Sequence, residues 1–197
     1  MLPRIFLPAI VCLVLPGASA AAQATSSNAV RVVARDVERR VDVTVGGLPF
    51  TSYIYPTSLK KPVLYPIHSA SGALVTRGYP LAPRPGERVD HPHHAGLWFN
   101  YGNVSGLDFW NNSTAIKDSA ASHMGTILHR AVRGVSSGAG EGSLDVTTEW
   151  VNYKGRALLK ENTHFTFRAH DGFRSIDRIT RSRRSTAPCR SRTTRKA

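Results

Sequence analysis

The stretch L-D-V-T-T-E-W-V-N-Y-K-G-R-A-L-L-K-E-N-T-H-F-T-F-R, residues 144–168, decides the fold class. Apolar and polar residues alternate over Leu144–Asn152, and Lys154-Gly155 provides a turn before a second run over Ala157–Arg168. A period of two places alternate side chains on opposite faces of a strand. Two such runs joined by a short glycine-containing turn are typical of a β-hairpin. The stretch therefore predicts two antiparallel strands with one buried face.

The same pattern extends outward in both directions. Further strands are expected at Val41–Val45 and Phe50–Tyr55 across Gly46-Gly47, at Val63–His68 and Ala73–Arg77 across Ser71-Gly72, at Thr126–Val135, and at Phe173–Ile179, with a short helix at Ala115–Ser122. Many antiparallel strands with short connections favour an all-β fold, an antiparallel β-sandwich. We expect one sandwich domain over residues 41–180, preceded by an N-terminal segment with a first strand in residues 21–40.

Asp90–Trp110, D-H-P-H-H-A-G-L-W-F-N-Y-G-N-V-S-G-L-D-F-W, holds the densest mixture of chemically versatile residues. His91 and His93 flank Pro92, which favours an extended residue before it. An extended backbone would project both imidazoles from one face, a pair suited to metal ligation or to proton transfer near neutral pH. The alternative is that these histidines are exposed and solvated, with the neighbouring apolar residues serving as strand core.

Each polar or aromatic residue type in this stretch suggests a role. We assign acid/base or metal-ligand roles to His91 and His93, an orienting carboxylate to Asp90, hydrogen bonding of sugar hydroxyls to Asn100 and Asp108, and ring stacking to Trp98 and Trp110.

A divalent metal on His91 and His93 would need a third protein ligand. The chain has neither H-E-x-x-H nor C-x-x-C, so His123 and His129 are the candidate third ligands. Each is also explained as a surface or structural histidine. Glu149 and Trp150 lie on a predicted strand, where solvated charge and packing account for them.

The N-terminus resembles a secretory signal. A basic residue, the apolar run Ile5–Leu15 and the small residues Ala18-Ser19-Ala20 predict a signal peptide over residues 1–20. The apolar run is too short to span a bilayer, and no later segment approaches the length needed. The two cysteines, Cys12 and Cys189, lie outside the predicted domain, so its stability must come from its core. An exported protein, periplasmic or extracellular and without a membrane span, is expected.

The formal net charge of +13 is unevenly distributed. Residues 181–197 carry seven basic residues and no acid or aromatic residue. A specific nucleic-acid function is not expected, because base stacking needs aromatic side chains and the rest of the chain is only modestly basic. We expect residues 181–197 to be a basic tail, produced either by a frameshift or as a natural disordered extension.

The Asp90–Trp110 motif, together with P-F-T-S-Y-I-Y-P and K-K-P-V-L-Y-P-I before it and M-G-T-I-L-H-R after it, resembles the exported bacterial PmoA-like family over about Gly47–Thr180. That family is labelled methane oxygenase PmoA and is similar to the supersandwich of galactose mutarotases. Its members run on in further strands, which implies that this chain holds the N-terminal part of the sandwich.

Three functions follow from the motif and the resemblance. The first is carbohydrate processing by histidine and carboxylate proton transfer. The second is carbohydrate binding without catalysis, in which the aromatic residues matter most. The third is a metal-dependent oxygenase, as the family label implies.

Overall fold

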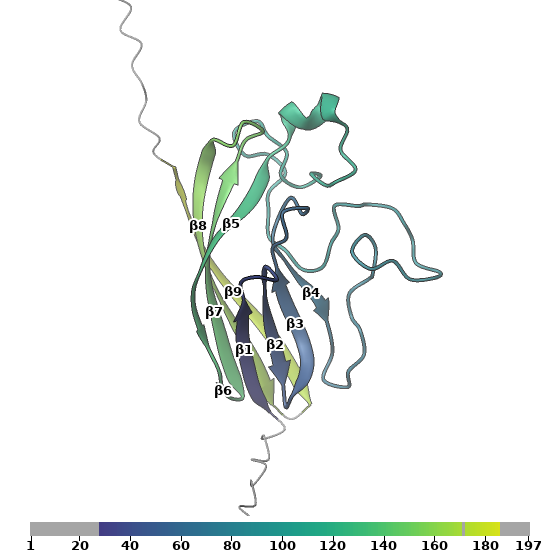
Figure 1. Cartoon of the computed structure of the whole chain (residues 1–197), viewed down its shortest axis with the longest axis vertical. Coiled ribbons are helices and arrows are strands. Elements are labelled where there is room, and N and C mark those ends of the chain that lie inside the picture. Colours follow the sequence, from purple (N-terminus) through teal and green to yellow (C-terminus); the bar gives the residue numbers. More distant parts are fainter. Residues whose placement is uncertain (1–27, 171, 186–197) are drawn as a thin grey trace, which may run out of the picture.

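Two antiparallel β-sheets face each other in the computed structural model, which describes residues 28–170 and 172–185 (Figure 1). The first sheet has the order β4 (Val63–Ile67), β3 (Leu48–Ile54), β2 (Arg40–Val45), β1 (Ala29–Arg35) and β6 (Gly138–Ala139). The second has the order β5 (Thr126–Ser136), β7 (Glu141–Val151), β8 (Ala157–His170) and β9 (Phe173–Arg184). The predicted all-β antiparallel sandwich is confirmed.

The core lies between the sheets and follows the alternation of the sequence. In β2 the valines Val41, Val43 and Val45 are buried, while the residues between them are half-buried. Phe167 of β8 is fully buried and meets the Phe50 ring of β3 edge to face, with centroids 6.2 Å apart. Such contacts join the sheets, and burying a large apolar side chain stabilises the fold by roughly 1.5–3 kcal/mol.

The hairpin over residues 144–168 forms as its sequence predicts. Leu144 of β7 pairs with Phe165 of β8 in an antiparallel register. The turn is closed by Asn152, whose Oδ1 accepts hydrogen bonds from the backbone N–H groups of Lys154 (3.0 Å) and Arg156 (2.9 Å). An asparagine that bonds its own turn in this way offers the chain a defined reversal.

Other segments differ from the prediction. Ala73–Arg77 is not a strand and makes a single bridge, between Leu74 and His68. The backbone N–H of Ile67 donates a hydrogen bond to the hydroxyl of Thr76 (3.2 Å). A side chain therefore accepts the bond that a backbone carbonyl of a paired strand would otherwise accept. The expected helix at residues 115–122 is a 3-10 helix, η1 (Asp118–His123).

The last strand extends farther than the alternation in the sequence indicates. β9 runs through Arg184, beyond Thr180, and pairs with β8 as far as Leu159. The predicted signal peptide and residues 186–197 of the expected tail lie outside the described residues. Within the described part, no helix is both long enough and apolar enough to cross a membrane.

Candidate functional site

The histidine loop, defined here as Asp90–Trp110, belongs to the long connection between β4 and η1 that lies beside the sandwich (Figure 1). It is tied to β4 by reciprocal backbone hydrogen bonds between Leu64 and Leu97, of 2.8 and 3.0 Å. Gly96 makes this approach possible: its φ is +64°, and a Cβ there would lie 2.5 Å from the Leu64 carbonyl oxygen. Only glycine adopts this backbone at little cost, so the glycine fixes where the loop meets the sheet.

The other end of the loop is held by a small apolar cluster. Phe109 is buried against Trp150 of β7, with ring centroids 4.8 Å apart, and also packs with Ile127 of β5. Gly125 leaves room for the Phe109 ring, because a Cβ at this position would lie 2.2 Å from it. Trp150 is thus a core residue, in agreement with the packing interpretation.

The three loop histidines lie close together, but not as the sequence predicts. His91 has φ +50°, and its carbonyl oxygen accepts the N–H of His94 (2.9 Å). The expectation of an extended segment with His91 and His93 on one face is wrong, because the backbone turns here. The turn gathers all three rings: the centroid distances are 5.7 Å for His91 and His93, 5.1 Å for His91 and His94, and 4.3 Å for His93 and His94.

Asp90 joins this cluster to a cation. Its Oδ1 accepts a hydrogen bond from Nη1 of Arg77 (3.0 Å), and its Oδ2 lies 3.2 Å from Nδ1 of His91. Arg77 holds the pKa of the Asp90 carboxyl below its usual range, with His91 adding to the effect. An ionised carboxylate beside Nδ1 fixes the orientation of an imidazole ring. The structure therefore places Asp90 where an orienting carboxylate would act.

His93 and His94 share an environment that disfavours their charged forms. Burial lowers the pKa of His93, and the neighbouring His94, Lys61 and His91 lower it further. The pKa of His94 is lowered by burial and then by His91 and Arg77. These shifts favour the neutral form of both rings, and a neutral imidazole has a nitrogen that can accept a proton.

Lys61 lies under the loop and was not identified from the sequence. It is only 5% exposed; its Nζ sits 3.7 Å from the centre of the Trp98 ring and donates to the carbonyl oxygen of Trp110 (2.9 Å). Burial lowers its pKa to about 8, against an opposing effect of Asp108. A buried lysine with a shifted pKa, lying beside the tryptophans and histidines of the loop, is a candidate for a functional role. No local pattern reveals it, because its partners are far away along the chain.

The two tryptophans of the loop meet above this lysine. The rings of Trp98 and Trp110 are 5.1 Å apart and inclined at 60°, and the edge of His94 faces Trp110 at 6.0 Å. Trp98 is half-buried, whereas Trp110 is 44% exposed. Trp110 is thus available to a ligand, and Trp98 packs on the Lys61 ammonium.

Asn100 and Asp108 hold the loop together. Nδ2 of Asn100 donates to the Phe109 carbonyl oxygen (3.0 Å), and its buried Oδ1 has no hydrogen-bond partner among the residues that the structure describes. The Asp108 carboxylate accepts from the backbone N–H (2.9 Å) and Nδ2 (2.6 Å) of Asn111. Burial raises the pKa of Asp108, but the bonds from Asn111 outweigh it and the net shift is downward. Both side chains thus have structural partners within the loop.

The candidate third metal ligands do not join the cluster. His129 lies on β5 between two tyrosines, stacked on Tyr55 at 3.8 Å with its Nδ1 3.2 Å from the Tyr53 hydroxyl. His123 ends η1, and its carbonyl oxygen accepts the N–H of Asp108 (2.9 Å). Among residues 28–170 and 172–185, no group of three or more His, Cys, Asp and Glu side chains could hold a metal ion. The donors described do not fit a three-ligand divalent metal site on His91 and His93.

The space beside these groups is limited. A crevice of about 30 Å³ lies next to Pro92 and His93, and a larger cavity of about 330 Å³ opens between Tyr55, His129 and Arg39. The histidine cluster presents an exposed surface with aromatic and imidazole groups beside this small crevice.

Comparison with known proteins gives one match. A family model described as "Family of unknown function (DUF6807)" matches residues 40–194. No curated protein and no solved structure matches the chain.

Proposed function

We propose that this chain, which belongs to the DUF6807 family, is an exported protein that processes a carbohydrate at the histidine loop by acid–base chemistry. The observation that carries the proposal is the row Arg77, Asp90 and His91, in which a guanidinium holds a carboxylate and the carboxylate faces an imidazole. This is the arrangement by which proteins orient a histidine for proton transfer. The resemblance to the PmoA-like family and to galactose-mutarotase-like sandwiches supports a sugar as substrate.

In this proposal His91 and His93 move the proton. Nδ1–H of His91 donates to Asp90, which leaves Nε2 to exchange a proton with the sugar; the side chain of His91 is 57% exposed and within reach of a ligand. His93, whose charged form is disfavoured by burial, is a second proton acceptor. The Lys61 ammonium beneath the loop favours negative charge that develops on a sugar oxygen.

Trp110 supplies the binding surface. Its exposed ring offers an apolar face to the C–H side of a pyranose, and the adjacent imidazole edges can bond its hydroxyl groups.

The proposal is tested by incubating the protein with a panel of mono- and disaccharides in D₂O and following the sugars by ¹H NMR. We expect new sugar signals, or exchange of a carbon-bound proton for deuterium, and a loss of about 10²-fold or more in kcat/KM for His91→Asn and Asp90→Asn. His170→Asn is the matched control, because His170 is an exposed histidine at the end of β8. Turnover that survives in both loop variants would overturn the assignment.

A second candidate, carbohydrate binding without catalysis, is favoured by the openness of the loop. Phe99 is 46% and Tyr101 66% exposed, and the crevice at His93 is small. In this case a sugar binds the wild type without being converted, Trp110→Ala abolishes binding, and His91→Asn leaves it unchanged. Calorimetry of these two variants therefore separates the two candidates.

Export is tested independently of the site. When the full chain is expressed in a bacterium, we expect the mature protein in the periplasm or medium, with an N-terminus at Ala21. N-terminal sequencing that finds Met1 on the cell-associated protein would contradict it.

A further inference from the structure

The outer face of the second sheet is polar and basic, and the proposed function does not use it. Successive residues of a strand alternate between faces, so the residues between the buried ones of β7 and β8 point outward. The strand register places Arg181 beside Asn162 and Thr147, and Ile179 beside His164 and Asp145, in two neighbouring rows.

Positive charge exceeds negative charge on this face. Arg133, Arg181 and Arg183 are exposed, and within the described part of the chain none of them forms a salt bridge with a carboxylate. Two acids near the hollow already have partners. Asp145 lies 2.8 Å from Nδ1 of His164, and Glu149 bonds Arg130 (2.8 Å) and approaches Lys160 (3.9 Å).

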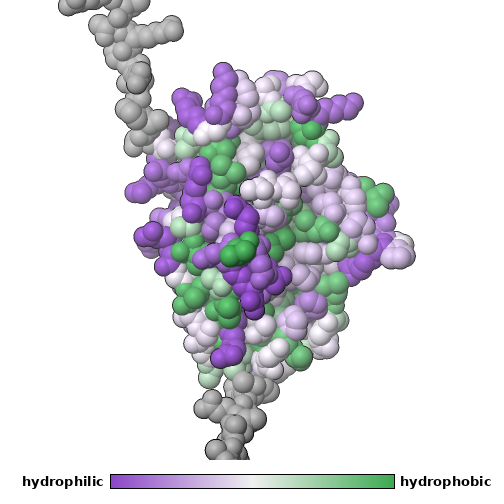
Figure 2. All heavy atoms as spheres, in the orientation of Figure 1, coloured by the Kyte–Doolittle hydropathy of each residue, from purple (hydrophilic) through white to green (hydrophobic). Residues whose placement is uncertain are grey.

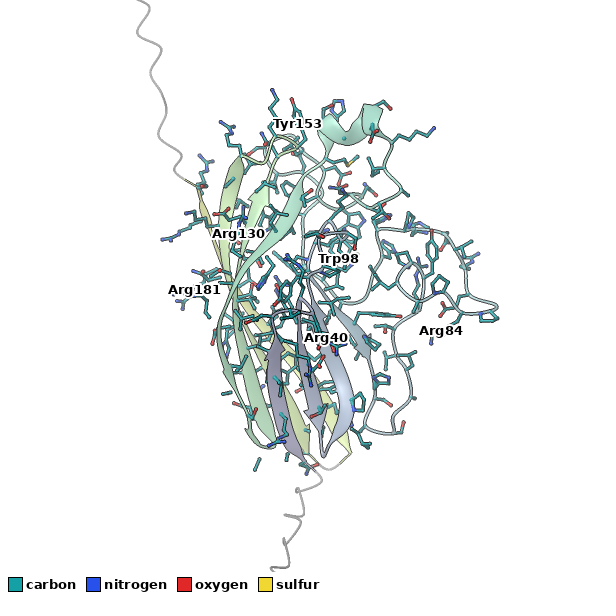
Figure 3. The ribbon with its side chains drawn as sticks, in the orientation of Figure 1. Arg40, Arg84, Trp98, Arg130, Tyr153 and Arg181 are labelled. Carbon is teal, nitrogen blue, oxygen red and sulfur yellow. The ribbon has the colours of Figure 1, made fainter. Side chains whose placement is uncertain are left out.

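The face is also hollowed. A depression of about 740 Å³ is lined by both polar and basic side chains, among them Arg133, Asp145, Asn162, His164, Arg181 and Arg183. Its volume is within the range of ligand-binding clefts. In Figure 3, Arg130 and Arg181 lie at the outer side of the second sheet, away from Trp98, and Figure 2 shows hydrophilic side chains gathered along the same side.

We propose that this hollow binds an acidic polysaccharide, a chain of uronate sugars. The three arginines at its rim bind carboxylates, since a guanidinium matches a carboxylate with two parallel hydrogen bonds. Asn162, Thr147 and Asp145 in its centre bond the hydroxyl groups, with the Asp145 carboxylate as an acceptor. The hollow is separate from the histidine loop, because the loop packs on Trp150 at the opposite face of the sheet.

The lining favours a uronate chain over a nucleic acid. Its lining contains no Phe, Tyr or Trp, so bases lack the large rings on which they usually stack, and stacking contributes much of the affinity for single strands. A carboxylate in the centre repels a closely spaced phosphate backbone, whereas it accepts hydrogen bonds from sugar hydroxyls. In a uronate chain each carboxylate is accompanied by ring hydroxyl groups that can donate to the Asp145 carboxylate.

The test is binding of the folded protein to polygalacturonate, measured by calorimetry at low and moderate salt. A neutral galactan and a single-stranded DNA 20-mer are measured in the same way for comparison. We expect polygalacturonate to bind most tightly, with affinity falling as salt rises. The double variant Arg181→Gln/Arg183→Gln should weaken binding at least tenfold.

The matched control is Arg31→Gln/Lys117→Gln, which removes the same amount of charge from exposed positions on β1 and before η1. Equal weakening by both double variants would show that only net charge matters and would overturn the proposed site. Tighter binding of the DNA, or binding of the neutral galactan with equal affinity, would overturn the choice of ligand.

Circular dichroism and the thermal midpoint show whether each variant remains folded. If the Arg181/Arg183 variant unfolds, Arg133→Gln, on a different strand, replaces it and must weaken binding.

Discussion

The sandwich core and the histidine loop are held together in different ways. The core is a cluster of buried side chains from both sheets, in which each strand is also paired by a ladder of backbone hydrogen bonds. The loop depends on a few separate contacts: the bridge between Leu64 and Leu97, Phe109 on Trp150, and Arg77 on Asp90. Changes in the core are therefore expected to alter the stability of the whole domain, and changes in the loop to alter the site while leaving the sandwich folded.

The largest effect is expected in the core. Phe167→Ala removes a fully buried ring that meets Phe50 across the two sheets, and should lower the free energy of unfolding by about 3–5 kcal/mol. Urea unfolding followed by circular dichroism measures the change. Phe173→Ala is the control, because this ring is 57% exposed and its loss should cost less than about 1 kcal/mol. Equal losses in the two variants would mean that the sheets are not packed through Phe167.

A smaller and more local effect is expected at the start of the loop. Gly96→Ala places a Cβ 2.5 Å from the Leu64 carbonyl oxygen at a positive φ, and should destabilise the loop by about 1–3 kcal/mol. Hydrogen exchange should then show loss of protection at the Leu97 N–H, which bonds Leu64, with strand protection unchanged.

Gly106→Ala is the control for this substitution. Gly106 also has a positive φ, +82°, but no atom lies within 4 Å of a Cβ placed there. It carries the backbone strain without the clash, so the Leu97 N–H should remain protected. If both variants expose Leu97, strain alone opens the loop and the close approach of Gly96 to Leu64 is unimportant.

The same contrast explains which features the sequence could predict. Alternation is a local property, so the strands of residues 144–168 and the buried face of β2 follow from it. The pairing of Asp90 with His91 was also accessible, because the residues are adjacent. The turn at His91 was missed because Pro92 favours an extended neighbour, and the bond from the His94 N–H overrides that preference.

Long-range contacts account for the rest. Lys61 reaches Trp98 and Trp110 only because the loop folds back over the start of β4, and Arg77 reaches Asp90 across an irregular segment. Neither partnership follows from a repeating pattern. The residues that give the loop its electrostatic character therefore had to be found in the structure.

The smallest of the three effects concerns a histidine inside the sandwich. Burial lowers the pKa of His129 to about 4, with Arg39 adding to the shift, so the folded state keeps this ring neutral between about pH 6.5 and pH 4. The unfolded chain binds a proton in that window, and stability must fall as the pH falls through it. After a discount for partial exposure, the loss in the free energy of unfolding is about 1–2 kcal/mol.

The substitution His129→Asn tests this expectation, because the Oδ1 of the asparagine can still accept from the Tyr53 hydroxyl. It should remove this part of the acid sensitivity, as measured by urea unfolding at pH 7 and pH 4.5. His170→Asn should leave it intact. If His129→Asn retains the full pH dependence, the acid sensitivity of the fold arises from other groups. Protonation of His129 in the sandwich would then affect the stability of the fold no more than protonation of a loop histidine.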